Sequence, residues 1–185
     1  MIGEPEVADV RIPMTKAEFL RWNPDDGFLY EYDGEYAEQN HAVKNTERYL
    51  VCNIRDAFVS TDAYRLRTRL FEETGCWVTE KQMRRPSGAL FTDEQIKAST
   101  VGRNPVPAFV VGIIFEHDRA NKIERKAGEY FRAGVQVRWP VYPELHMVRV
   151  LLSPRNLVSL FGTEVVSAAP VLPDLRMTID ELFAR

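Results

Sequence analysis

Cysteine is scarce in this chain, which has only Cys52 and Cys76 among 185 residues. The two do not form a CxxC motif, and no two histidines stand at the spacing of metal ligands. The sequence therefore supports neither a disulfide framework nor a zinc site. Reduced thiols are the simpler interpretation, and they are typical of a cytoplasmic protein.

Long apolar runs and a strong net charge are also absent. No span reaches the ~18 apolar residues expected of a membrane helix, and the first residues carry acids where a signal peptide has a positive segment. The formal net charge of -3 excludes the general basicity of a histone-like protein. We therefore expect a soluble, unexported, cytoplasmic protein with no membrane partner. Any contact with nucleic acid must come from a local basic surface.

Linkers rich in glycine and serine, internal repeats and low-complexity tracts are missing as well. A chain of 185 residues with 45% hydrophobic content suits one core, since ~100–200 residues per domain is usual. We expect an N-terminal extension over residues 1–14 and a single domain over residues 15–185.

Local signals predict a mixture of helices and strands. Thr15 and Glu18 form a capping box that opens a short helix through Trp22. Residues 28–38 alternate around Asp33-Gly34, a dipeptide favoured in tight hairpins because both of its positions tolerate positive φ. Further strands are expected at residues 64–71, 76–83, 89–91, 109–115, 135–141 and 145–152.

Helical spacing of apolar residues predicts one helix over residues 41–58 and another over residues 118–134. Asp118 is expected to cap the second helix and Gly134 to end it, and Thr178 is expected to cap a short final helix. The pattern is that of a mixed α/β protein, in which a sheet is covered by two principal helices.

The most informative stretch is the apolar strand over residues 109–115 and the basic amphipathic helix after it. In nucleases that cut phosphodiesters with a divalent metal, carboxylates at strand ends hold the ion, and a nearby lysine steadies the attacking water or the developing charge. Here a lysine, Lys126, is present on the helix, and the strand lacks the acids.

Several segments together resemble one known family, the Uma-type restriction endonucleases, over nearly the whole chain from Thr15 to Phe183. These segments are Tyr30–Glu35, Arg84–Pro86, Val106-Pro107 before the apolar strand, residues 118–134 with Lys126, Trp139, Tyr142–Glu144 and Leu172-Pro173. The resemblance implies the PD-(D/E)XK nuclease fold. This is a restriction-endonuclease-like α+β architecture with a mixed central sheet flanked by helices, here with an N-terminal helix and hairpin. It also implies a metal-dependent DNA endonuclease, with Mg²⁺ as cofactor if the enzyme is active.

The resemblance also implies where the metal ligands of the family would stand. Ser87 occupies the place of an expected aspartate, Gly112 that of a second metal-binding acid, and Ala108 that of another acid in the same motif. Glu31 and Lys126 match the early glutamate and the helix lysine of the family.

Magnesium needs one or two carboxylates, and neither serine nor glycine supplies that charge. We therefore expect a protein with impaired catalysis, in which Glu31 and Lys126 are remnants and no metal site is assigned. The alternative is an active enzyme whose acids have relocated, to Glu116 by position or to Asp93. The structural interpretations of these acids, which involve no catalysis, are that Asp93 and Asp118 cap helices and that Glu116 lies on a solvated loop.

Lys126 and Glu31 each have a structural interpretation beside the catalytic one. Lys126 lies at the border of an apolar helix stripe, where a lysine usually extends its amine to water. Glu31 could face outward from the hairpin. His41, His117 and His146 are isolated, and none is assigned a catalytic role.

Basic residues supply the candidate nucleic-acid surface. Period-two spacing would place Arg65, Arg67 and Arg69 on one face of a strand, and Arg84 and Arg85 would extend that surface to contact phosphates. The alternative is a solvated sheet face whose charge prevents aggregation.

Three classes of function therefore remain. They are a metal-dependent DNA endonuclease, a nuclease-fold remnant that binds nucleic acid or protein without cutting, and a structural or oligomeric module, for which a homodimer is expected.

Overall fold

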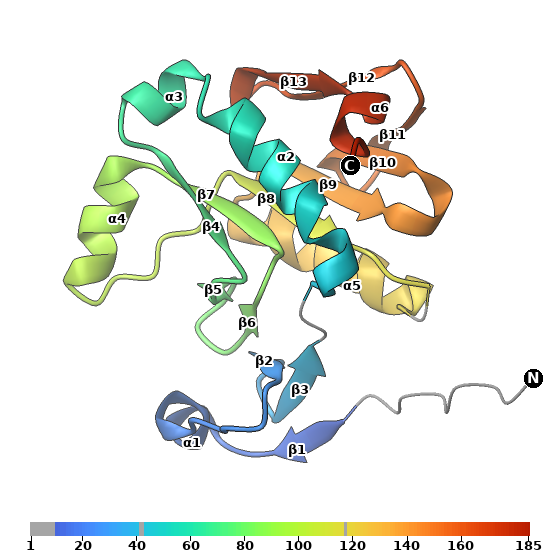
Figure 1. Ribbon diagram of the computed structural model, residues 1–185. Coiled ribbons are helices and arrows are strands. Elements are labelled where there is room, and N and C mark those ends of the chain that lie inside the picture. Colours follow the sequence, from blue (N-terminus) through green and yellow to red (C-terminus); the bar gives the residue numbers. More distant parts are fainter. Residues whose placement is uncertain (1–9, 41–42, 117) are drawn as a thin grey trace, which may run out of the picture.

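The computed structural model describes residues 10–40, 43–116 and 118–185, and a six-stranded sheet runs through its centre (Figure 1). The strands follow the order β11-β10-β9-β8-β7-β4. Their bounds are β4 Arg69–Glu72, β7 Gly88–Phe91, β8 Phe109–Ile113, β9 Val137–Tyr142, β10 Met147–Ser153 and β11 Asn156–Phe161. The central strands β8 and β9 are parallel, because the helix α5 (Ala120–Ala133) crosses over between them.

Two smaller sheets complete the strands. A five-stranded sheet has the order β1-β3-β2-β6-β5, and β12 pairs with β13 in a two-stranded ribbon. The bounds are β1 Arg11–Pro13, β2 Leu29–Tyr32, β3 Tyr36–Asn40, β5 Cys76–Trp77, β6 Met83–Arg84, β12 Val165–Ala168 and β13 Leu172–Thr178. Part of the expected N-terminal extension, residues 11–13, is thus an edge strand paired with β3.

Two helices cover the central sheet, α2 in front of it and α5 behind it in Figure 1. Alternate residues of β8 divide between two cores. Phe109, Val111 and Ile113 pack in the cluster that contains the buried residues of α2, and Val110 packs in the cluster that contains Tyr130 of α5. Gly112, two residues after Val110, therefore lies on the face toward α5.

Within the described ranges there are six α-helices and two 3₁₀ turns. The α-helices are α1 Lys16–Arg21, α2 Arg48–Phe58, α3 Asp62–Arg65, α4 Asp93–Thr100, α5 Ala120–Ala133 and α6 Ile179–Leu182. The 3₁₀ turns are η1 Asn45–Glu47 and η2 Pro143–Leu145. Across the ranges described, no helix combines the length and apolar character needed to cross a membrane.

Several sequence predictions are confirmed. The mixed sheet flanked by helices is present, and Thr15 and Thr178 each form the reciprocal capping box with the glutamate three residues later. Gly134 ends α5 with φ of 114°, a conformation that glycine adopts without a Cβ penalty.

The hairpin also forms, with β2 and β3 in antiparallel register, although its turn differs in detail from the prediction. Gly34 has a φ of 110°, whereas Asp33 acts through its side chain. Its carboxylate accepts hydrogen bonds from the backbone amides of Glu35 and Tyr36. Asp33 thus holds the turn as an Asx-type acceptor.

The predicted strand over residues 64–71 is wrong in its first half. The side chain of Thr61 accepts a hydrogen bond from the amide of Tyr64 and starts the short helix α3. Arg67 follows with a positive φ of 65°, and β4 begins only at Arg69. The three arginines therefore do not share one face of a strand.

Two predicted caps are also wrong. Thr92 caps α4 in a capping box with Gln95, so Asp93 is the first helical residue. Asp118 does not cap α5; its carboxylate accepts a hydrogen bond from the amide of Phe115, and Arg119 is the residue before the helix.

The helix predicted over residues 41–58 is a 3₁₀ turn followed by α2, and His41 and His117 lie outside the described residues. The three C-terminal strands β11, β12 and β13 were not predicted. The alternation of apolar and polar residues that marks a half-buried strand is weak in these segments. In β11, for example, the apolar residues Leu157, Val158 and Phe161 are exposed.

Loss of the Thr178 cap should measurably destabilise the C-terminal region. Thr178→Ala removes the hydroxyl that accepts a hydrogen bond from the amide of Glu181. We expect the free energy of unfolding to fall by about 1 kcal/mol, since this is the usual cost of losing a cap. Urea denaturation measures it, with Thr178→Ser as the control that keeps the hydroxyl. Equal stability of all three proteins would contradict the expectation.

Candidate active site

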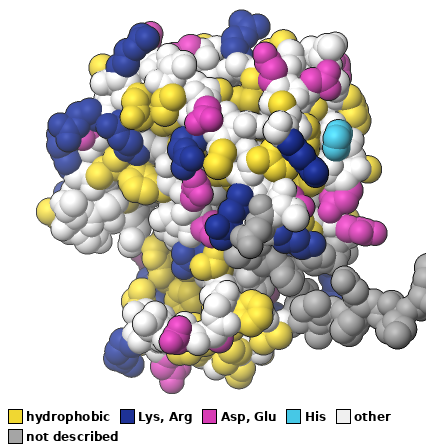
Figure 2. Space-filling view, viewed as in Figure 1, with side chains coloured by type: hydrophobic (Ala, Val, Ile, Leu, Met, Phe, Trp, Pro, Cys, Tyr) yellow, Lys and Arg dark blue, Asp and Glu magenta, His cyan; other side chains and the backbone are white. Residues whose placement is uncertain are grey.

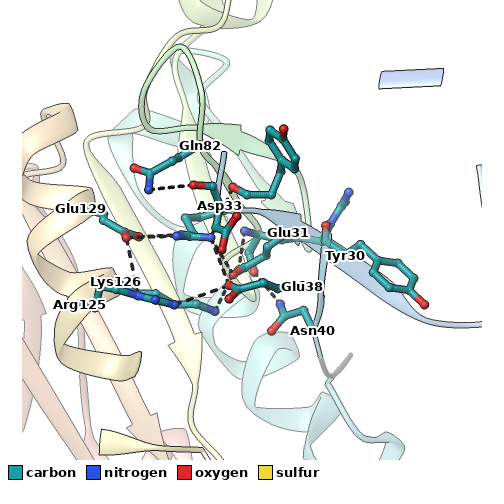
Figure 3. A network of polar contacts seen from close by, with 12 residues as sticks. Tyr30, Glu31, Asp33, Glu38, Asn40, Gln82, Arg125, Lys126 and Glu129 are labelled. Atoms are coloured by element: carbon teal, nitrogen blue, oxygen red, sulfur yellow. Dashed lines mark hydrogen bonds and ion pairs between the residues drawn. The ribbon is translucent and has the colours of Figure 1, made fainter. Parts of the chain in front are cut away.

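Glu31 of β2 and Lys126 of α5 meet inside the protein, although 94 intervening positions separate them in the sequence. The Nζ atom of Lys126 lies 2.8 Å from Oε2 of Glu31, whose side chain is only 1% exposed (Figure 3). The backbone amide of Arg85 donates a hydrogen bond of 2.9 Å to the other oxygen, Oε1. Both remnant residues predicted from the sequence therefore belong to one site. The outward-facing interpretation of Glu31 is wrong.

The charge of Glu31 is fixed by its neighbours. Burial alone would raise the pKa of this carboxyl, but Lys126, Arg84 and the Arg85 amide outweigh burial and hold the pKa below its ordinary value. Glu31 is therefore an ionised carboxylate at neutral pH, with one oxygen engaged by an ammonium and the other by an amide.

A second ion pair stands beside the first and connects β6 of the five-stranded sheet to α5. The guanidinium of Arg84 binds Glu129 through two contacts, of 2.6 Å and 3.1 Å, and both side chains are buried. Its Nη1 atom also lies 3.7 Å from one oxygen of Glu31 and 3.7 Å from one oxygen of Glu38. Burial lowers the pKa of Arg84, but the surrounding carboxylates raise it above its ordinary value.

This arrangement corrects the expectation that Arg84 contacts phosphate. Arg84 is 0% exposed, and it shares the neutralisation of three buried acids, Glu31, Glu38 and Glu129, with Arg125 and Lys126. Arg85 is half-buried; it donates hydrogen bonds to the carbonyl oxygens of Tyr30 and Glu73 and reaches the neighbouring cavity. Of the two predicted arginines, Arg85 alone borders a space that a ligand could enter.

That cavity has a volume of about 60 Å³ and is bordered by both Glu31 and Lys126. Ser87 and Gly112, two positions where the family resemblance implies acids, also line it. The hydroxyl of Ser87 accepts a hydrogen bond from the amide of Ile113, 2.9 Å away. A Cβ at Gly112 would meet only Ile114, at 3.8 Å, so the backbone there leaves room for a side chain. Ala108, by contrast, precedes β8 and does not line the cavity.

The acids proposed as relocated ligands do not gather here. Asp93 lies on α4, where it pairs with Lys97 at 2.6 Å and with Arg67 at 3.5 Å. Glu116 is exposed and lines a separate cavity with Glu144 and Arg149. Asp118 borders the cavity of Glu31, but one of its oxygens already accepts the Phe115 amide.

The residues present do not fit a divalent metal. Such an ion takes six to eight oxygen ligands if it is Ca²⁺ and about six if it is Mg²⁺, with carboxylates among them. Here one carboxylate is neutralised by Lys126, Ser87 contributes a neutral hydroxyl, and Gly112 contributes no side-chain atom. The part of the chain that the structure describes contains no group of three or more histidines, cysteines or acids placed to hold a metal.

The other predicted basic residues lie elsewhere. Arg65 pairs with Asp62 at 2.6 Å, Arg67 with Asp93, and Arg69 donates to the carbonyl oxygens of Tyr64 and Thr68. Figure 2 shows basic side chains interspersed with acidic ones on this face of the molecule, without a uniformly basic surface. The predicted line of three arginines is therefore replaced by separate ion pairs and backbone contacts.

Sequence reasoning missed Arg138, which also lines the cavity. Arg138 stands in β9 between Val137 and Trp139, and all three residues are buried. A single charged residue inside an apolar strand was the signal that could have identified it, because a buried charge needs a partner. The sequence prediction also missed Glu38 and Glu129, whose partners in the buried ion pairs lie far away in the sequence.

The ionised state of Glu31 should appear in the pH dependence of stability. Because its folded pKa is lowered, its contribution is complete above the ordinary value of 4.5 and is lost as the pH falls through the folded value. We expect Glu31→Gln to be less stable than the wild type at pH 7, and the difference to narrow toward pH 3. Urea denaturation at several pH values tests this, with the exposed Glu94→Gln as the matched control. A difference that stays constant with pH would show that Glu31 is neutral in the fold.

Comparison with known proteins places this geometry in a family. A family model described as "Putative restriction endonuclease", Uma2, matches residues 17–180. The fold is similar to that of a crystal structure from Anabaena variabilis described as a putative nuclease belonging to DUF820, with a TM-score of 0.78 and 18% identity over 92% of this chain and 98% of that one. Curated proteins yield no match. The expected nuclease-like fold is thus confirmed, and the chain belongs to the Uma2 family of restriction-endonuclease-like proteins.

Proposed function

We propose that this protein is a restriction-endonuclease-like protein whose hydrolytic centre is impaired. The observation that carries the proposal is the ion pair between Lys126 and the buried Glu31, beside a cavity where Ser87 and Gly112 stand in place of acids. Family membership supports DNA as the polymer that such a scaffold meets and a divalent metal as the cofactor of its active members.

The electrostatics of the site support impairment. A divalent cation near a phosphate must be surrounded by negative oxygen ligands that offset its charge and its lost hydration. In this cavity Lys126 already provides the positive charge that Glu31 requires, so a metal at the same oxygen would meet an ammonium 2.8 Å from it. Two positive charges that share one carboxylate oxygen repel each other in a partly buried site.

The alternative of an active enzyme with relocated acids receives less support. Asp93 is held by Lys97 and Arg67, and Glu116 lines a different cavity. Homodimer formation remains an expectation of the family resemblance.

We expect the purified wild-type protein to leave supercoiled plasmid DNA intact in Mg²⁺ or Mn²⁺, at the level of an EDTA control. Agarose electrophoresis over a time course measures the cleavage. Lys126→Ala prepared in parallel shows whether any residual nicking belongs to this site. Metal-dependent cleavage that disappears in Lys126→Ala would overturn the proposal, whereas nicking equal in both proteins would indicate a contaminant.

Acidic residues at positions 87 and 112 should create a site that binds a divalent metal ion. We expect Ser87→Asp combined with Gly112→Glu to bind Mn²⁺ at least about tenfold more tightly than the wild type, since carboxylates are the ligands this ion prefers. Calorimetric titration with Mn²⁺ measures binding, and the plasmid assay measures any gain of cleavage. The control is Ser87→Asn with Gly112→Gln, which has nearly the same shape without the charges. Equal Mn²⁺ affinity of the wild type and both variants would contradict the role assigned to these positions.

A further inference from the structure

The cavity beside Glu31 is lined by more positive than negative side chains. Among the residues that the structure describes, the positively charged ones in its lining are Arg85, Lys122, Lys126 and Arg138, and the negatively charged ones are Glu31 and Asp118. A site that binds a divalent cation has the opposite balance, because the ligands must supply negative charge. The charge of this cavity therefore favours an anion.

Arg138 is the residue in the cavity lining whose positive charge most clearly lacks a partner. It projects from β9, is only 3% exposed, and its guanidinium lies over the ring of Tyr130 with 5.7 Å between its Cζ atom and the ring centroid. Its Nη1 atom donates a hydrogen bond of 3.2 Å to the carbonyl oxygen of Ile123. Among the residues that the structure describes, no carboxylate lies within ion-pair distance of it.

A buried guanidinium without a counter-ion is costly. Removing a charged group from water costs several kcal/mol unless a partner of opposite charge compensates it, so buried arginines are usually paired. Burial lowers the pKa of Arg138 from its ordinary value, and the attraction of Glu124 and Glu31, neither of which forms an ion pair with it, offsets that lowering only in part. Arg84, equally buried, shows the usual solution, since Glu129 binds it with two contacts. The contrast between the two arginines indicates a missing partner for Arg138.

The two carboxylates of the cavity do not supply that partner. Glu31 is engaged by Lys126 and the Arg85 amide, and Asp118 accepts the amide of Phe115. The cavity of about 60 Å³ offers room for several water molecules, each of which needs roughly 10–15 Å³.

We propose that this cavity binds a phosphate-type oxyanion directly, without a divalent metal, and that Arg138 and Lys126 are its principal cationic contacts. The inference rests on the proposed loss of the metal site and extends it: replacement of the acids at Ser87 and Gly112 removes the negative charge that would repel an anion. Guanidinium and ammonium groups bind phosphate oxygens through charge-assisted hydrogen bonds. The anion has two plausible sources of the same chemistry, free phosphate and the phosphate groups of a nucleic-acid strand.

The first experiment is a calorimetric titration of the wild-type protein with inorganic phosphate in EDTA, at constant ionic strength set with chloride. Parallel titrations with a short DNA oligonucleotide, with and without a 5′-phosphate, distinguish the sources. Saturable binding of inorganic phosphate, or of an oligonucleotide that phosphate displaces, is the expected result. Absence of saturable binding to any of these ligands would overturn the inference.

Three variants locate the binding. We expect Arg138→Gln to weaken phosphate binding by about tenfold or more, as the loss of a charge-assisted contact does. Gly112→Glu, which adds a negative charge at the cavity wall and leaves Arg138 in the sequence, should weaken it similarly and keeps the test available if Arg138→Gln fails to fold. Arg132→Gln is the control, because Arg132 is an exposed residue of the same helix as Lys126 and does not line the cavity.

The outcomes separate this inference from the proposed function. Equal weakening by Arg132→Gln and by the cavity variants would mean general attraction to a charged surface, and the inference would fail. Cleavage of DNA by the wild type in Mg²⁺ would refute the proposed impairment, and it is measured in a separate buffer. A protein that neither cuts DNA in Mg²⁺ nor binds phosphate in EDTA would leave the impairment supported and the anion site rejected.

Discussion

Buried charge holds the N-terminal hairpin against the rest of this protein. Arg84 stands at the contact between the five-stranded sheet and α5, where Glu129 binds it and Glu31 and Glu38 approach it. Breaking one member of such a cluster leaves another charge buried and unpaired, at a cost of about 3–5 kcal/mol. The position of Glu31, and with it the geometry of the whole site, therefore depends on this cluster.

The same region of the protein shows how this scaffold satisfies its buried polar groups without a metal ion. Lys126 compensates Glu31 at 2.8 Å, and the Ser87 hydroxyl satisfies the amide of Ile113. These contacts meet the local requirements of charge and hydrogen bonding without a metal ion. Family membership and fold are consequently compatible with a changed site, since a fold does not by itself determine the chemistry that it supports.

Much of the architecture was predictable because it depends on local signals. Capping boxes at Thr15 and Thr178, the left-handed stop at Gly134 and the apolar strand from Phe109 all follow from neighbouring residues, and the structure contains each of them. The predicted strand through Arg65 failed because the Thr61 hydroxyl starts a helical turn there. Asp118 was assigned to the wrong hydrogen bond because an aspartate can serve either a helix end or a preceding turn.

The sequence by itself determined the family, the mixed α and β content and the two residues, Glu31 and Lys126, that mark the site. Through the family resemblance it also predicted that Ser87, Ala108 and Gly112 stand where acids are expected, because each of these positions can be read singly. Only the tertiary structure decided that Arg84 is buried in an ion-pair cluster, that Asp93 and Glu116 lie outside the cavity, and that Arg138 enters it. The physical reason is that the cost of a charge depends on its burial and on partners far away in the chain, and neither is encoded in local spacing.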